Sequence, residues 1–91
     1  MADIEFNALD GRYEKDVDGH IVYADIRKKD GVVYIDYVYA PPALRGQGAA
    51  GEFMRDLMDV FLREQCKVKP LCGYAASWLR KHENEYAELV V

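Results

Sequence analysis

The stretch "ALRGQGAAGEF", residues 43–53, decides how the rest of the chain is interpreted. Its Gly46, Gly48 and Gly51 form the GxGxxG pattern of dinucleotide-binding folds, while Arg45, Gly48 and Ala50 form RxxGxA, a pattern of loops that hold coenzyme A. Both patterns surround a phosphate with backbone amides. The sequence on either side of the glycines distinguishes between them.

The residues before this stretch predict a meander of antiparallel strands. Short runs with two-residue alternation are separated by Asp-Gly pairs at 10–11, 18–19 and 30–31, and Asp-Gly supplies the positive φ that tight hairpins require. The last run, "VVYIDYVY", is rich in β-branched and aromatic residues and predicts a central strand. Its alternation places four side chains on one face: Val33, Ile35, Tyr37 and Tyr39.

The residues after the prolines at 41 and 42 change to a helical period. A helix is predicted from residue 47 to about residue 66, since proline ends the preceding strand and an apolar stripe follows. The stripe consists of Ala50, Phe53, Met54, Leu57 and Phe61, broadened by Met58 and Leu62. "KVKPL" predicts a fifth strand, "GYAASWLRKH" a second helix and "NEYAELVV" a last short turn. The predicted class is α+β, in the order ββββαβαα.

This order excludes the two nucleotide-binding interpretations of the glycines. The dinucleotide fold needs a parallel βαβ unit in which a strand leads directly into the glycines, whereas here an antiparallel meander and two prolines precede them. The GxxxxG spacing of Gly46 and Gly51 fits a nucleoside-triphosphate loop, but Glu52 and Phe53 stand where Lys and Ser or Thr are required.

The predicted helix begins without a capping side chain, because no Ser, Thr, Asp or Asn precedes it. Gly48 and Gly51 each lower helix propensity by about 1 kcal/mol relative to alanine, and Ala49 and Ala50 add no bulk. Such a turn of bare backbone suits an anion at the positive end of the helix dipole, with Arg45 adding a charged contact. The alternative is that the small residues only let the helix pack closely on the sheet.

Composition and charge limit the classes of function. Residues 1–91 are expected to form a single domain, 51% hydrophobic and 31% charged, with a net charge of -4 and no basic face for nucleic acid. The uncharged runs are too short for a membrane span, and "MADIEF" lacks a signal core, so a cytoplasmic protein is expected. Cys66 and Cys72 fit neither a CxxC pair nor a zinc site, and no metal site is expected. Ser77 is the single serine, and no nucleophile elbow surrounds it.

The segments "VYAPPALRGQGAAGEFM" and "KPLCGYAASWLRKHENEYAELV" together resemble the GNAT acetyltransferase superfamily. More narrowly, they are similar to its small single-domain members, which lack the usual N-terminal helices and carry a P-x-C-x-Y segment after the fifth strand. The resemblance extends over nearly the whole chain and implies the GNAT fold, acetyl-CoA as cosubstrate and an amine as acceptor.

The resemblance also implies which residues bind the cofactor. The backbone of Val38, Tyr39 and Ala40 would lie along the pantetheine arm, and the amides of six loop residues would hold the pyrophosphate: Arg45, Gly46, Gln47, Gly48, Ala49 and Ala50. Two positions depart from the family's pattern. Relatives commonly have a histidine where this chain reads "DYVY", and a larger aliphatic residue in place of Ala49. The first departure argues against proton transfer by histidine.

Cys72 and Tyr74 are the candidate catalytic residues. Cys72 falls where the second helix is predicted to begin, and a helix N-terminus favours a thiolate, so Cys72 could be acetylated transiently or shuttle a proton. Tyr74 could protonate the thiolate of coenzyme A. Each has a structural alternative, in which Cys72 is a small buried residue and the ring of Tyr74 only packs. Asp36 and Glu14 are weaker candidates for the base that deprotonates the amine, since strand carboxylates are commonly exposed.

Three interpretations of function remain open at this stage. The first is an N-acetyltransferase that uses acetyl-CoA and an unidentified amine acceptor. The second is a coenzyme A or acyl-CoA binding module without turnover, and the third is a purely structural domain. His20, His82 and Cys66 are interpreted as structural. The amine acceptor is a small molecule or a protein. Because so short a chain leaves little wall for a specific acceptor pocket, a protein surface or an acceptor supplied by a partner is expected.

Overall fold

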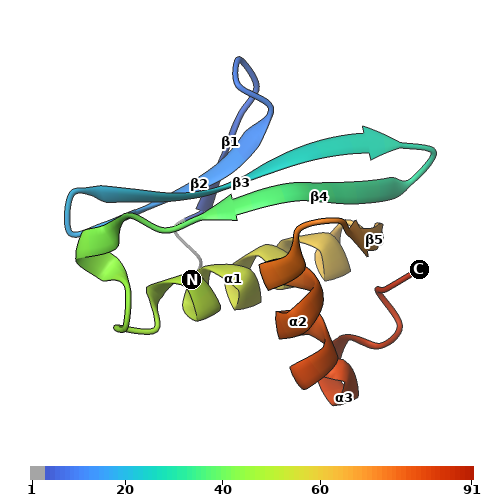
Figure 1. Ribbon diagram of the computed structural model, residues 1–91. Coiled ribbons are helices and arrows are strands. Elements are labelled where there is room, and N and C mark those ends of the chain that lie inside the picture. The colour runs from blue at the N-terminus through green and yellow to red at the C-terminus, as the bar shows by residue number, and fades with distance from the viewer. Residues whose placement is uncertain (1–3) are drawn as a thin grey trace.

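The computed structural model describes residues 4–91, so residues 1–3 of the predicted domain lie outside the described residues. Its centre is a five-stranded sheet in which the strands follow one another in chain order (Figure 1). The strands are β1 (Ile4–Asn7), β2 (Arg12–Val17), β3 (His20–Lys29), β4 (Val32–Tyr39) and β5 (Lys67–Pro70). The first four pair as antiparallel neighbours, and β5 lies parallel to β4. The predicted meander and fifth strand are therefore confirmed.

The helices follow the predicted order but differ from the prediction at and before α1. They are α1 (Ala49–Arg63), α2 (Gly73–Lys81) and α3 (Glu83–Tyr86), and a short 3-10 helix, η1 (Pro42–Leu44), precedes α1. The sequence reasoning missed η1. It also began α1 two residues too early, since Gly48 has a φ of 78° and stands outside the helix as its N-cap residue, and it extended α1 about three residues too far, since the helix ends at Arg63. The α+β class and the order of the major elements are confirmed.

The core lies between one face of the sheet and α1. Five residues of α1 are completely buried: Phe53, Met54, Leu57, Met58 and Phe61. Burial of side chains of this size contributes about 1.5–3 kcal/mol each. Leu62, predicted to broaden the apolar stripe, is instead 45% exposed, and Val60 is buried.

A bulge in β4 corrects the prediction for this strand. Ile35 pairs with Ile26 of β3 and Tyr37 pairs with Asp25, so Asp36 is the extra residue with no partner on β3. Because one extra residue exchanges the two faces of a strand, the buried positions change from Val33 and Ile35 before the bulge to Val38 after it. The prediction that Tyr37 and Tyr39 share a face with Val33 and Ile35 was wrong.

All three helices lie on the same side of the sheet, as Figure 1 shows. α1 packs beneath β1, β2 and β3, and α2 packs beneath β4 and β5. Within residues 4–91, no helix covers the opposite face. The sheet therefore has a covered face that forms the core and an open face on which Tyr37 is 48% exposed.

Candidate functional site

The second half of β4 has a free edge. β5 pairs with β4 only from Val32 to Ile35. The chain then turns away, and the amides of Leu71 and Cys72 both donate to the carbonyl of Ile35, each at 3.0 Å. In the described part of the chain, no strand pairs with the side of Tyr37–Tyr39 that faces away from β3. Backbone groups on this edge are available to a ligand that lies along the strand.

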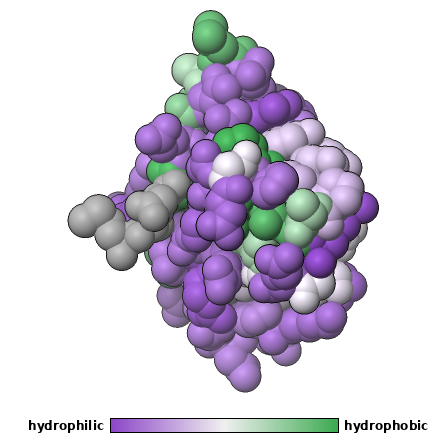
Figure 2. All heavy atoms as spheres, turned by 90° about the vertical axis from the view of Figure 1, so that its left-hand side faces the viewer, coloured by the Kyte–Doolittle hydropathy of each residue, from purple (hydrophilic) through white to green (hydrophobic). Residues whose placement is uncertain are grey.

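A pocket of about 160 Å³ opens beside this free edge. It is lined by Tyr37, Val38, Tyr39, Ala40, Arg45, Ala50 and Tyr74. Residues of β4, the loop, α1 and α2 thus meet at one place, among them the predicted pantetheine-binding residues and Tyr74. Figure 2 looks at this end of the molecule, where small hydrophobic patches are enclosed by hydrophilic residues.

The first turn of α1 presents unused amides beside the pocket. The amide of Glu52 bonds to the carbonyl of Gly48 at 3.0 Å, which begins the helix. No side chain caps this end. For the amides of residues 48–51, no acceptor is found anywhere in residues 4–91. Four such groups at the positive end of a helix of about four turns favour an anion, and a phosphate would satisfy them.

The surroundings of the loop glycines test whether its small residues are there for close packing or for the conformation of the backbone. A Cβ atom at Gly46 or Gly48 would meet no atom within 4 Å, so close packing does not require glycine there. Both have positive φ, 83° and 78°, which does favour glycine. Gly51 differs, because a Cβ would lie 3.5 Å from Nε1 of Trp78. That distance is an ordinary van der Waals contact, so close packing does not require glycine at position 51 either, and it is the positive φ of Gly46 and Gly48 that favours glycine in this loop.

Arg45 connects the loop to the end of β4. Its Nε donates to the carbonyl of Ala40 at 3.1 Å, and its guanidinium lies 5.8 Å from the centroid of the Tyr39 ring. Gln47 is held inside the loop, since its Nε2 donates to the carbonyl of Ala43 at 2.9 Å. Arg45 thus places a positive charge at the mouth of the pocket.

Cys72 and Tyr74 stand at the start of α2 with different exposures to the pocket. Cys72 is the N-cap residue, and its carbonyl accepts the amide of Ala76 at 2.9 Å. Its side chain is partly buried against the core and does not line the pocket. Tyr74 does line it and is 42% exposed. Burial raises the pKa of Tyr74, and the neighbouring Cys72 raises it further, so the phenol keeps its proton well above neutral pH.

The two strand carboxylates suggested as bases are both engaged. Asp36 accepts two hydrogen bonds from Arg27, from Nε at 2.8 Å and from Nη2 at 2.9 Å. These bonds and the charge of Arg27 hold the pKa of Asp36 below its usual range, which makes Asp36 a poor base. Glu14 accepts a hydrogen bond from Asn7 and lies on the open face of β2, away from the pocket lining.

The remaining candidates lie elsewhere. His82 stacks on Trp78 with ring centroids 3.9 Å apart, and its Nδ1 lies 2.8 Å from the carbonyl of Trp78. His20 begins β3 and is exposed. Among residues 4–91, no three His, Cys, Asp or Glu side chains are grouped so that they could hold a metal ion. Each helix in that range is too short or too polar to cross a membrane.

The sequence did not predict that the side chains of Tyr37 and Tyr39 lie on the open face of the sheet. The bulge at Asp36 makes both rings available on the open face, where Tyr23 of β3 joins them. The bidentate partner of Asp36, Arg27, is nine residues earlier in the sequence, and a single sequence carries no local signal for that pair.

Comparison with known families gives one match. The family model described as GCN5-related N-acetyl-transferase matches residues 12–89, which include every strand and helix named above except β1. No curated protein matches this sequence.

Proposed function

The chain belongs to the GCN5-related N-acetyltransferases, and we propose that it takes its acetyl group from acetyl-CoA and transfers it to an amine on a protein. The family establishes acyl transfer and the GNAT fold. The choice of acetyl-CoA rests chiefly on one observation, the unused amides of residues 48–51 beside the free edge of β4. A pyrophosphate on those amides would direct the pantetheine arm along the strand.

The cofactor would be held by backbone rather than by side chains. The free edge of Val38, Tyr39 and Ala40 would pair with the amide groups of pantetheine, as an added strand pairs with a sheet edge. Arg45 would supply the positive charge nearest the phosphates. Its present hydrogen bond to Ala40 keeps that charge at the junction of loop and strand. The thioester would then lie in the pocket between Tyr37 and Tyr74.

The reaction follows from this placement. The lone pair of a neutral amine attacks the carbonyl carbon of the thioester, a C–N bond forms, and the C–S bond breaks. The thiolate of coenzyme A takes the proton of the Tyr74 hydroxyl, whose raised pKa keeps it protonated at neutral pH. The proton lost by the amine passes to water, since Asp36 is held by Arg27, and water returns a proton to the Tyr74 phenolate.

Cys72 acts, in this proposal, by positioning Tyr74. Its amide bonds to Ile35 of β4, and its carbonyl bonds to the second turn of α2, which fixes the start of the helix against the strand. Its side chain lies outside the pocket lining, whereas that of Tyr74 lies within it. A direct transfer from acetyl-CoA to the amine therefore accords better with the geometry than transfer through a Cys72 thioester.

The test is calorimetric titration of acetyl-CoA into the wild type, Gly48→Glu and Gly31→Glu. The two glycines share a φ of 78° and open space beside the backbone, so both substitutions introduce the same strain and the same charge. Gly31 lies in the β3–β4 turn, at the other end of β4 from the loop. We expect Gly48→Glu to weaken binding by about 100-fold or more, roughly 2.7 kcal/mol, and Gly31→Glu to bind as the wild type does.

Two results would contradict the proposal. Absence of binding by the wild type would remove acetyl-CoA as the cosubstrate, and unchanged binding by Gly48→Glu would remove the phosphate from the start of α1. Release of free coenzyme A thiol in the presence of an amine-bearing protein then separates a transferase from a binding module, because a module binds without consuming acetyl groups.

A further inference from the structure

A row of side chains crosses the open face of the sheet and ends at the pocket. The strand register pairs Glu5 of β1 with Glu14 of β2, Glu14 with Tyr23 of β3, and Tyr23 with Tyr39 of β4. Because directly opposed residues share a face, these four side chains form one line across four strands. The line runs from two carboxylates to an aromatic ring that borders the pocket.

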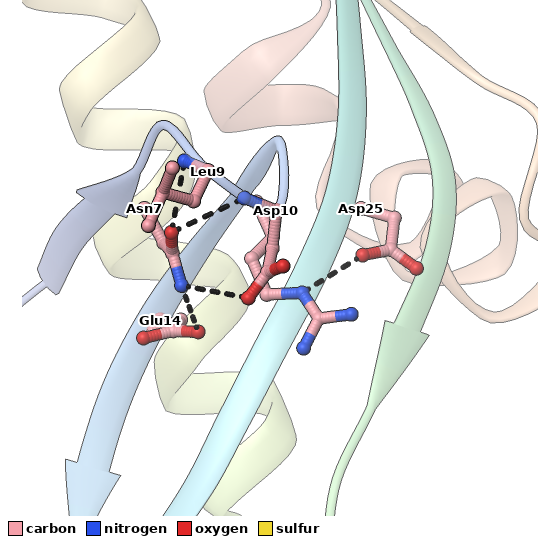
Figure 3. A network of polar contacts seen from close by, with 6 residues as sticks. Asn7, Leu9, Asp10, Glu14 and Asp25 are labelled. Carbon is pink, nitrogen blue, oxygen red and sulfur yellow. Dashed lines mark hydrogen bonds and ion pairs between the residues drawn. The ribbon is translucent and has the colours of Figure 1, made fainter.

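The carboxylate end of this row is locally unfavourable. Like charges directly opposite each other destabilise a sheet, and Glu5 opposes Glu14. In the part of the chain that the structure describes, no cationic side chain pairs with either one. Asn7 alone donates to Glu14, at 3.1 Å (Figure 3). Asp16 and Ile21 join the two glutamates around a hollow of about 410 Å³. The hollow has the charge and the volume to receive a cationic side chain.

The aromatic end of the row already holds a cation. The guanidinium of Arg12 lies 3.9 Å from the centroid of the Tyr23 ring. Its Nε donates to Asp25 at 3.1 Å, and Figure 3 marks this bond to Asp25. The Tyr23 and Tyr39 rings are 5.3 Å apart, and the Tyr37 and Tyr39 rings are 6.4 Å apart. Clustered tyrosine rings attract cations through their faces. An ammonium group that approaches the pocket over this face would meet ring faces. The charge of Arg12 is paired with Asp25, and that of Arg45, 5.8 Å from the centroid of the Tyr39 ring, would be neutralised by the phosphates of the bound cofactor.

The open face and the pocket are continuous. Tyr37 and Tyr39 line the pocket from the open side of the sheet, while Ala50 and Tyr74 line it from the helical side. The unused amides that would hold the cofactor are on the helical side as well, at the start of α1. A second substrate therefore has access to the thioester from the open face.

We propose that the open face of the sheet docks a basic, extended polypeptide segment whose acceptor lysine enters the pocket at Tyr39 while a second basic residue lies over Glu5 and Glu14. The inference rests on the proposed function and specifies its acceptor. Strands in a sheet are about 4.8 Å apart, so Glu14 is about 10 Å and Glu5 about 14 Å from Tyr39. An extended peptide rises about 3.3 Å per residue. The second basic residue is therefore three or four positions from the lysine.

The test compares three synthetic peptides of about 13 residues, each with one central lysine. The peptides are identical except at the third and fourth positions on either side of that lysine. These positions carry arginine, glutamine or glutamate. Acetylation of each peptide is measured with the wild type, with the double variant Glu5→Gln/Glu14→Gln, and with Glu88→Gln as a control. Glu88 is an exposed carboxylate near the C-terminus and lies outside the row. Binding of fluorescent peptides is measured separately by anisotropy, without acetyl-CoA.

We expect the wild type and Glu88→Gln to prefer the arginine peptide over the glutamine peptide by about tenfold in kcat/KM, and to use the glutamate peptide least. The double variant should reduce this preference to about twofold and weaken binding of the arginine peptide, with its affinity for acetyl-CoA unchanged. Since the substitution removes a repulsive pair, the double variant should be at least as stable as the wild type, which can be measured by urea unfolding.

Three outcomes overturn the docking proposal: equal use of the three peptides by the wild type, an undiminished preference in the double variant, or acetylation of free lysine as efficient as that of the arginine peptide. Each of these leaves acetyl-CoA binding intact and so leaves the proposed function standing. Failure of the wild type to bind acetyl-CoA would instead overturn the proposed function, and the calorimetric titration identifies that case independently.

Discussion

The two halves of β4 have the same backbone direction and similar composition but different surroundings. The first half, Val32 to Ile35, pairs with β3 on one side and β5 on the other, and Ile35 is completely buried. The second half pairs with β3 alone, and Tyr37 is half exposed. Between them lies the bulge at Asp36. One strand thus contributes first to the core and then to the site, because a single extra residue changes which side chains face the core.

This comparison predicts opposite consequences for substitutions two positions apart. Ile35→Ala should lower the free energy of unfolding by about 2–5 kcal/mol, since it removes buried methyl groups and leaves a cavity. Tyr37→Ala should lower it by about 1 kcal/mol or less, because half of the ring is already in water. Urea unfolding of both variants measures the difference.

For activity we expect the opposite order, with the larger loss in Tyr37→Ala and the smaller loss in Ile35→Ala. The folded fraction of Ile35→Ala should still bind acetyl-CoA, whereas Tyr37→Ala alters the lining of the pocket and should reduce kcat/KM for the acceptor peptide. Equal losses of stability at the two positions would contradict the division of β4 into a core half and a site half.

The next largest effect is expected at Tyr74. Tyr74→Phe removes the hydroxyl that acts as the acid. We therefore expect kcat to fall about 10- to 100-fold while the affinity for acetyl-CoA changes little. Tyr34→Phe is the matched control, since Tyr34 belongs to the first half of β4 and lies outside the pocket lining. Steady-state kinetics and calorimetry separate the two quantities.

The pH profile gives Tyr74 a second test. Burial raises its pKa above that of an ordinary tyrosine, which is about 10, so the hydroxyl remains a proton donor throughout the neutral range. In the wild type kcat should decline only on the far alkaline side, as the hydroxyl ionises, and this decline should be absent in Tyr74→Phe. A decline of the same size and position in both proteins would assign it to another group.

The major elements were predictable because their signals are local. Asp-Gly turns, the alternation of the strands and the helical stripe from Phe53 to Phe61 each depend on neighbours in sequence, and the structure confirms the order ββββαβαα that they indicated. The loop was predictable for the same reason. Gly48, without a capping residue before it, already indicates that the first amides of α1 need an external acceptor.

The bulge was not predictable, since it depends on the register between two strands. Nothing within "VVYIDYVY" indicates that Asp36 stands opposite no residue of β3. The prediction that Tyr37 continues the buried face of Ile35 followed from regular alternation and was wrong for this reason alone. The open-face row from Glu5 to Tyr39 depends on three registers at once and was equally hidden from the sequence.

The smallest effect is expected at the bulge itself, where Arg27 holds Asp36 by two hydrogen bonds. Both side chains are in contact with water, 62% and 34% exposed, so Asp36→Asn should lower stability by only about 0.5–1 kcal/mol at neutral pH. The hydrogen bonds and charge of Arg27 lower the pKa of Asp36 in the folded protein. The stabilisation by the Arg27–Asp36 pair is therefore fully present above the pKa of an ordinary aspartate, about 3.9. It is lost as the pH falls through the lower pKa of Asp36 in the folded protein.

Urea unfolding of the wild type and Asp36→Asn, from about pH 7 down towards pH 3, should thus show a difference that shrinks with acid. Asp25→Asn is the control for the loss of an acidic side chain beside the bulge, because Asp25 pairs with Tyr37 next to Asp36 but accepts its single hydrogen bond from Arg12 of β2. If the Arg27 pair also fixes the bulge, Asp36→Asn should disturb the second half of β4 and weaken acetyl-CoA binding more than Asp25→Asn does. Equal affinities in the two variants would mean that the backbone of β4 forms the bulge without help from Arg27, and the ion pair would then be a consequence of the bulge rather than its cause.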